Sequence, residues 1–180
     1  MNKQLILVSG PSRSGKSFWA ESIMKKNSSV VYIATSPNSY DKTWQSRIKK
    51  HRDRRPNHWN LIESPNDLSS EILKLNSSQS ILIDSLGGFV TKYITYRDKD
   101  WKHVEDLFVQ SLKTSNSFIL IVIEEAGWGV VPSTHVGNVF RERLSILAQR
   151  LQIISSQSWL VLQGRAINLA DISVPIHEHE

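Results

Sequence analysis

Residues 10–17 form a complete G-x-x-x-x-G-K-S phosphate loop. An apolar run precedes the loop and a helix-like stretch begins at Phe18, so the motif has the strand–loop–helix context of a nucleotide site. In such a loop, backbone N–H groups and the start of the following helix bind phosphate oxygens. Lys16 is expected to reach the β- and γ-phosphates, and the Ser17 hydroxyl is expected to ligate Mg²⁺. The sequence therefore predicts binding of a nucleoside triphosphate. The loop consists of Gly10, Pro11, Ser12, Arg13, Ser14, Gly15, Lys16 and Ser17.

A carboxylate ends a second apolar run, where Asp84 follows Ile81-Leu82-Ile83. In nucleotide-binding proteins of this kind, a carboxylate in that place holds Mg²⁺ or its water shell, although an Asp that caps a turn is the alternative. Other polar or small residues also stand at the ends of predicted strands: Ser9, Ala34, Thr35, Ser36, Glu124 and Glu125. Ligands of open α/β sheets bind beyond the carboxyl ends of the strands. This convergence favours a functional role for Asp84.

A basic segment, residues 47–55, contains six Lys or Arg residues, one Asp and His51. A lone histidine in a charged run is commonly a solvated surface residue. Imidazole is also a good nucleophile toward phosphorus, and neighbouring cations would stabilise the transferred group. A third possibility is that the segment binds nucleic acid. No aromatic stacking platform is evident beside it, which weakens that possibility.

Composition limits the class of protein. The chain has 180 residues, a net charge of +5 and no cysteine, so disulfides, cysteine-ligated zinc and a thiol nucleophile are excluded. It has no run of eighteen apolar residues and no secretory h-region, so we expect a cytoplasmic protein without a membrane span. The length suits one domain, and we expect residues 1–180 to form a single P-loop nucleotide-binding domain.

Short apolar runs alternate with longer helical patterns. This alternation predicts an α/β fold with a mainly parallel sheet covered by helices on both faces. Residues 165–175 are expected to add a short antiparallel edge strand. A helix is expected to begin near Ser64, as its cap, with Pro65 in its first position. Strands are predicted over residues 4–9, 30–34, 80–84, 118–123 and 159–163, and helices over 16–26, 40–54, 67–75, 86–96, 101–112 and 136–155.

Taken together, these motifs resemble the bifunctional adenosylcobinamide kinase/adenosylcobinamide-phosphate guanylyltransferases of cobalamin biosynthesis. The resemblance spans almost the whole chain and rests on several motifs in the same order. They are the phosphate loop with Arg13, residues 31–36, Arg47-Ile48-x-x-His51-Arg52-x-x-Arg55-Pro56-x-x-Trp59, the Asp84-Ser85-Leu86 turn, Glu125-x-Gly127-x-Gly129-x-Val131-Pro132 and Phe140-Arg141.

The resemblance implies a RecA-like P-loop fold, a homotrimer and two reactions. ATP or GTP first phosphorylates adenosylcobinamide, with Mg²⁺ as cofactor. GTP then guanylylates His51, and the phosphorylated corrinoid takes the GMP to give adenosylcobinamide-GDP and pyrophosphate. Lys16 and His51 would be the catalytic residues, and Ser17 and Asp84 the metal ligands. The nucleotide contacts of the family correspond to residues 10–17, Ala34, Thr35, Ser36, His51, Arg52, Asp53, Arg54, Glu63 and Asp84.

The chain departs from the family pattern where we expect corrinoid and subunit contacts. These positions are Glu124, Lys92, Ser145, Ile146 and Ala148. Two other functions compete with the bifunctional enzyme. One is a small-molecule P-loop kinase without guanylyl transfer, and the other is a RecA-like ATPase that binds nucleic acid through the basic segment. We expect a corrinoid and a nucleoside triphosphate as partners, and no nucleic acid.

Overall fold

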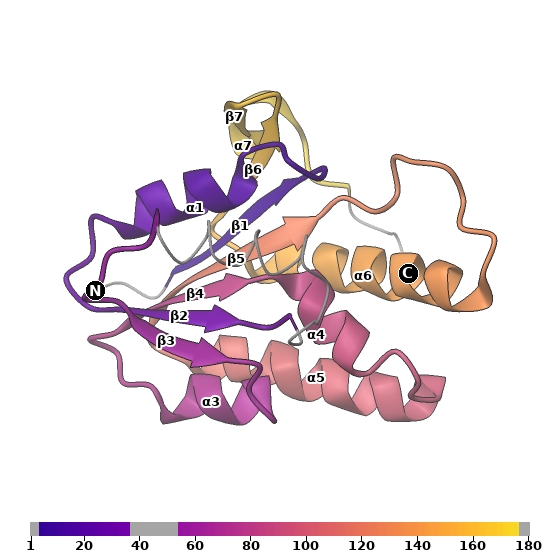
Figure 1. Cartoon of the computed structure of the whole chain (residues 1–180), viewed down its shortest axis with the longest axis horizontal. Coiled ribbons are helices and arrows are strands. Elements are labelled where there is room, and N and C mark those ends of the chain that lie inside the picture. Colours follow the sequence, from indigo (N-terminus) through magenta and orange to yellow (C-terminus); the bar gives the residue numbers. More distant parts are fainter. Residues whose placement is uncertain (1–3, 37–53, 177–180) are drawn as a thin grey trace.

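The computed structural model describes residues 4–36 and 54–176. A seven-stranded sheet with the order β3-β2-β4-β5-β1-β6-β7 forms its centre (Figure 1). All neighbouring strands are parallel except β6 and β7, which are antiparallel. This sheet confirms the predicted α/β class with a mainly parallel sheet and a short antiparallel edge. The strands are β1 (Gln4–Gly10), β2 (Val30–Ala34), β3 (Asn60–Glu63), β4 (Ser80–Asp84), β5 (Phe118–Glu124), β6 (Gln157–Leu162) and β7 (Arg165–Asn168).

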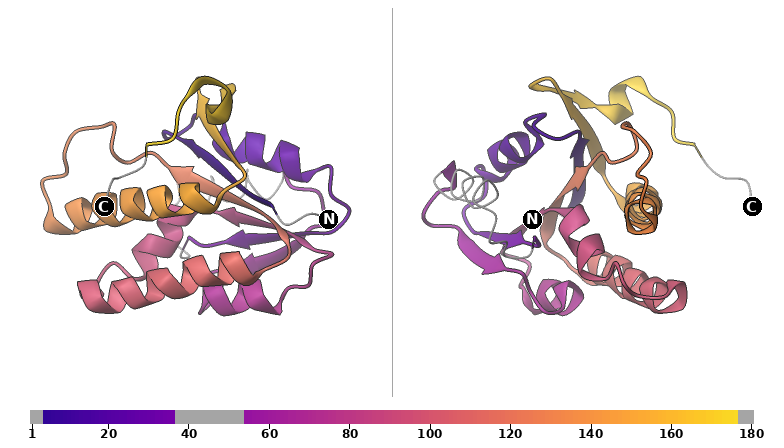
Figure 2. Two further views of the ribbon diagram at one scale, coloured as in Figure 1. Left: turned by 180° about the vertical axis from the view of Figure 1, so that it is seen from behind. Right: turned by 45° about the vertical axis from the view of Figure 1, so that its right-hand side comes forward.

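Helices cover both faces of this sheet, as predicted (Figure 2). Helix α1 (Lys16–Met24) packs on one face through Ala20 and Met24. The opposite face carries α3 (Leu68–Lys74), α4 (Leu86–Lys92), α5 (Asp98–Thr114) and α6 (His135–Ile154). A short helix, α7 (Leu169–Ile172), follows β7.

The central strands have continuous apolar runs in their middle because both of their faces are buried there. In β1, Leu5 and Leu7 enter the core beneath α3 to α6, whereas Ile6 and Val8 enter the core beneath α1. Successive strand side chains point to opposite faces, so one continuous run supplies both cores.

Several sequence predictions differ from the structure. The edge strand predicted over residues 165–175 ends at Asn168, and Leu169–Ile172 form helix α7, which Asn168 caps through its side chain. Strand β3 was not predicted, since Asn60, Leu61 and Glu63 are exposed at the sheet edge and give no buried apolar run. Helix α4 ends at Lys92 instead of Tyr96. The predicted Ser64 cap is wrong: Asp67 caps α3 by accepting hydrogen bonds from the backbone N–H groups of Ser69 and Ser70. The predicted helix over residues 40–54 lies outside the described residues except for Arg54.

No helix within residues 4–36 and 54–176 has both the length and the apolar character needed to cross a membrane.

Candidate active site

The carboxyl ends of four neighbouring parallel strands lie together. We call this region the carboxyl edge and define it by Gly10, Ala34, Asp84 and Glu124, the last residues of β1, β2, β4 and β5. Backbone hydrogen bonds join neighbouring strands at this edge. Thr35 N donates to Asp84 O at 3.2 Å, and Glu125 N donates to Gly10 O at 3.0 Å. The convergence predicted from the sequence is therefore confirmed.

The phosphate loop joins β1 to α1 and lies close against β6. Gly10 has φ 155°, and a Cβ there would lie only 2.3 Å from the Val161 carbonyl oxygen, so a side chain is excluded. Gly15 caps α1 with φ 99° in the left-handed region. The Lys16 side chain is buried, and its Nζ donates to the Pro11 carbonyl oxygen at 3.1 Å. The buried Lys16 ammonium is therefore hydrogen-bonded to the backbone of the phosphate loop itself.

The Ser14 hydroxyl of this loop has no protein partner among the described residues, although Ser14 is buried. No side chain caps the start of α1 at Gly15, and the first N–H groups of a helix have no partners within the helix. A buried hydroxyl without a partner is costly, so a ligand oxygen would satisfy it. Together with Lys16, these groups suit a phosphate anion.

Asp84 accepts a hydrogen bond from the Tyr32 hydroxyl at 2.7 Å. Burial and the Asp84 carboxylate together raise the pKa of Tyr32 well above its usual value, so the phenol stays protonated and donates. The Arg55 guanidinium lies 4.0 Å from the centre of the Tyr32 ring. Tyr32 therefore links the carboxylate at the end of β4 to Arg55, the last residue of the basic segment.

The residues after β2 are fixed to the turn after β4. Thr35 Oγ1 donates to Ser85 O at 2.5 Å and accepts from Ser85 N at 2.8 Å. Ser36 O accepts from Ser64 Oγ at 2.8 Å, and Ser64 N donates to Ala34 O at 2.7 Å. Glu63, the last residue of β3, pairs with Ala34 in the sheet register. The structure thus brings residues 34–36 and Glu63 to the same side as Asp84.

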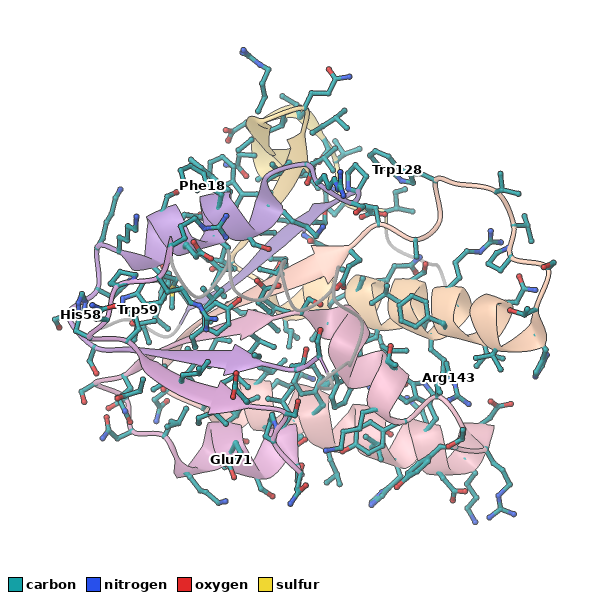
Figure 3. The ribbon with its side chains drawn as sticks, viewed as in Figure 1. Phe18, His58, Trp59, Glu71, Trp128 and Arg143 are labelled. Carbon is teal, nitrogen blue, oxygen red and sulfur yellow. The ribbon has the colours of Figure 1, made fainter. Side chains whose placement is uncertain are left out.

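Arg54 is joined to α1 by a buried ion pair. Its Nε and Nη2 donate to the two carboxylate oxygens of Glu21, at 2.5 and 2.6 Å. Glu21 is 1% exposed, and the Arg54 guanidinium lies 5.6 Å from the centre of the Phe18 ring (Phe18 is labelled in Figure 3). The hydrogen bonds that Arg54 donates to Glu21 raise the pKa of Arg54. The end of the basic segment is therefore attached to the helix that follows the phosphate loop.

Two glutamates after β5 have different partners. The Glu124 carboxylate accepts hydrogen bonds from Ser85 Oγ and, at 2.8 Å, from Gly87 N at the start of α4. Glu125 instead interacts with the Ser9 hydroxyl and the Lys16 ammonium. Burial raises the pKa of Glu125, although both of those partners oppose the rise. One glutamate thus supports the turn after Asp84, and the other faces the phosphate loop.

The donor set at the carboxyl edge suits Mg²⁺ held jointly with a nucleotide. The described residues contain no group of three or more His, Cys, Asp or Glu side chains that could hold a metal alone. Mg²⁺ is usually bound through one or two protein oxygens together with substrate phosphates and waters. The Ser17 hydroxyl and the Asp84 carboxylate supply oxygens of that kind, and a carboxylate that accepts one hydrogen bond keeps further acceptor capacity.

Of the residues predicted to bind nucleotide, the structure gathers 10–17, 34–36, Glu63 and Asp84 around the carboxyl edge, whereas Arg54 is attached to α1 through Glu21. His51, Arg52 and Asp53 lie outside the described residues. The departures from the family pattern lie elsewhere, apart from Glu124. Lys92 donates to the Pro65 carbonyl oxygen at the end of α4, whereas Ser145, Ile146 and Ala148 lie along α6.

Sequence reasoning missed the roles of Glu21 and Tyr32. Both stand at positions that the local pattern marks only as helix and strand, and their partners, Arg54 and Asp84, are 33 and 52 residues away. The available signal was a charged residue on the covered face of α1 and a hydroxyl within an apolar strand. Neither signal identifies the partner.

One solved structure shares the fold, and a second has a lower similarity. A structure from Pyrococcus horikoshii OT3, titled "Structural study of Project ID PH0250", superposes with a TM-score of 0.56 at 9% identity, covering 93% of this chain and 86% of that chain. The RadB recombinase has a TM-score of 0.45 at 14% identity, covering 88% of this chain and 74% of that chain.

Sequence relatives identify the family. The "Bifunctional adenosylcobalamin biosynthesis protein CobU" of Escherichia coli is 31% identical, with 92% of this chain and 99% of the relative covered, and that of Salmonella typhimurium is 28% identical with the same coverage. The corresponding CobP of Pseudomonas aeruginosa is 33% identical over 70% of this chain and 74% of its own. The model of one family matches residues 6–169. The chain belongs to that family, described as "Cobinamide kinase / cobinamide phosphate guanyltransferase".

Proposed function

We propose that the chain catalyses two successive reactions on a corrinoid. A nucleoside triphosphate first phosphorylates the primary alcohol on the aminopropanol arm of adenosylcobinamide. GTP then guanylylates an enzyme histidine, and the phosphorylated corrinoid takes the GMP to give adenosylcobinamide-GDP. Family membership and the bifunctional relatives favour this function over a kinase without guanylyl transfer and over a nucleic-acid-binding ATPase.

The observation that carries the proposal is the unsatisfied loop at the carboxyl edge. Ser14 Oγ is buried without a partner, Lys16 is buried beside it in the chain, and the Asp84 carboxylate ends β4 at the same edge. These groups offer a donor, a cation and a metal-binding oxygen, which is the set that a triphosphate with Mg²⁺ requires. Both reactions begin with such a nucleotide, so one loop serves both.

In the phosphoryl transfer, Lys16 and the N–H groups at the start of α1 bind the β- and γ-phosphates. Ser17 and Asp84 would hold Mg²⁺, which when bound offsets the charge on the phosphates. The alcohol oxygen of the corrinoid forms a bond to the γ-phosphorus while the bond to the bridging oxygen breaks.

In the guanylyl transfer, we assign the nucleophile to His51. A ring nitrogen forms a bond to the α-phosphorus of GTP, and pyrophosphate leaves with the electron pair of the broken bond. The phosphate oxygen of the corrinoid then displaces the histidine. Arg54 supports this assignment, because the Glu21 pair holds it on α1 and it follows His51 by only three positions, a span of at most about 11 Å.

Labelling with GTP tests the histidine. We expect incubation with α-labelled GTP and Mg²⁺ to give a protein-bound label in the wild type and none in His51→Ala. His58→Ala is the matched control, since His58 is an exposed histidine only seven residues away. An unlabelled wild-type protein, or full labelling of the His51 variant, would contradict the intermediate. Phosphorylation of cobinamide by an unlabelled protein would indicate the kinase alone.

We also propose that the enzyme is a homotrimer, as the resemblance to its family implies. Exposed apolar side chains on α6 supply a surface for subunit contact, and these include Ile146, one of the departures from the family pattern.

A further inference from the structure

Glu125 follows β5 and is joined directly to the first residue of the phosphate loop. Its backbone N–H donates to the Gly10 carbonyl oxygen at 3.0 Å. Strands β5 and β1 are parallel neighbours in register, with Glu124 opposite Gly10, so the side chain that follows β5 emerges beside the loop. Glu125 is therefore placed by two rigid strands and not by a flexible connection.

The Lys16 ammonium and the Ser9 hydroxyl both favour the ionised form of the Glu125 carboxylate and so oppose the rise in its pKa that burial causes. The Glu125 side chain is half-buried. In a phosphate loop this lysine contacts the β- and γ-phosphates. A carboxylate within reach of Lys16 thus lies beside the position of the γ-phosphate, which is the group transferred in the first reaction.

The chain beyond Glu125 opens to solvent. Trp128 (labelled in Figure 3) is 59% exposed, Val130 is 95% exposed, and Gly127 and Gly129 have no atoms near the position of a Cβ. A bulky acceptor with an apolar body can approach the carboxylate along this loop, because the Trp128 and Val130 side chains are exposed and a methyl group on either glycine would meet nothing outside its own chain neighbours.

We propose that Glu125 is the general base of the phosphoryl-transfer reaction. This inference rests on the proposed function. The alcohol oxygen of the acceptor forms a bond to the γ-phosphorus, and the bond between that phosphorus and the bridging oxygen breaks as the nucleoside diphosphate leaves. The alcohol proton passes to a carboxylate oxygen of Glu125 and is later released to water. Glu125 is needed for an alcohol nucleophile and not for a neutral imidazole, which has no such proton to lose in forming the bond to phosphorus.

Glu124 does not compete for this role. Its carboxylate oxygens are held by Ser85 and Gly87, and Oε2 lies within 2.6 Å of the position that a Cβ on Gly87 would take. That carboxylate is occupied in holding the turn after Asp84.

Measuring both activities of the same variant distinguishes a general base from a residue with a structural role. We expect Glu125→Gln to lower kcat for phosphorylation of cobinamide by about 100-fold or more, with KM for ATP changed less than about threefold. Labelling of the protein by α-labelled GTP should stay within about threefold of the wild type. Glu125→Asp should recover part of the lost kcat. Glu142→Gln is the matched control, because Glu142 is an exposed carboxylate on α6, and it should leave both activities unchanged.

The unfolding temperature of Glu125→Gln serves as the control for correct folding. The raised pKa of Glu125 means that the ionised carboxylate costs folding free energy at neutral pH. Glu125→Gln should therefore unfold at a temperature equal to or above that of the wild type, and a lower temperature would point to a structural role.

Three results would overturn the inference. Equal losses of phosphorylation and GTP labelling would make Glu125 a residue that shapes the loop. Recovery of the kinase rate at high Mg²⁺ would make it a metal-binding residue. Undiminished kcat in Glu125→Gln would remove any role in the transfer. A wild-type enzyme that does not phosphorylate cobinamide would instead contradict the proposed function.

Discussion

At the scale of single residues, the Glu21–Arg54 pair is the polar contact on which we expect the most stability to depend. Glu21 is almost fully buried, and both of its oxygens are bonded to Arg54. We expect Glu21→Gln to lower the free energy of unfolding by about 2 kcal/mol, because it leaves a half-buried guanidinium without its anionic partner. Chemical denaturation at neutral pH measures this loss.

Glu71→Gln is the control for this prediction. Glu71 pairs with Lys74 at 2.7 Å, but the Lys74 side chain is 65% exposed, and such surface pairs contribute little. Similar losses for the two variants would contradict a special role for the buried pair. GTP labelling of Glu21→Gln would further show whether attachment of Arg54 to α1 assists transfer to His51.

Residue types predicted part of this site, but not the pairing of its members. The phosphate loop and Asp84 were found because backbone and phosphate chemistry demand particular residues at fixed spacing in the chain. Glu21 and Tyr32 were missed because their partners come from other elements, and only the packed fold decides which charge meets which. Glu125 was recognised as a strand-end residue. Its position near Lys16 could not be predicted, because it depends on the pairing of β1 with β5.

At the scale of elements, α4 must pack closely against the chain after β2. A Cβ on Gly88 would lie 2.3 Å from Thr35 Oγ1, 2.8 Å from the Thr35 backbone carbon and 2.9 Å from Ser36 N. We expect Gly88→Ala to cost about 1–3 kcal/mol of stability, because backbone has to move. It should also weaken nucleotide binding, since residues 34–36 are displaced.

Gly127→Ala tests whether that cost comes from packing. The same methyl group at Gly127 would meet nothing within 4 Å, so we expect almost no change in unfolding temperature or nucleotide affinity. Calorimetric unfolding and titration with GTP measure both quantities. A stable Gly88 variant with normal affinity would show that α4 and residues 34–36 adjust independently.

Elements with strong local signals were predicted well. Strands β2 and β4 were placed at their observed bounds because their apolar runs end abruptly in polar residues. The capping residue of α3 was misassigned because Ser64 and Asp67 both suit a cap. The structure uses Asp67, whereas Ser64 takes φ 44° and bonds back to residues 34 and 36. Local sequence offers two caps there, and a long-range contact selects one.

At the scale of the whole molecule, the proposed homotrimer predicts which surface is covered. Ile146 and Ile153 lie seven residues apart on α6, so they project from the same side of the helix, and they are 47% and 82% exposed. Light scattering of the purified protein should give three times the 20.5-kDa mass of one chain.

Ile146→Asp combined with Ile153→Asp should lower that mass, because a charge buried at an interface without a partner is unfavourable. Leu73→Asp, on the exposed side of α3, is the control and should leave the mass unchanged. A single-chain mass for the wild type at all concentrations would contradict the trimer, and a trimer that persists in the α6 variant but not in the α3 control would move the interface to α3.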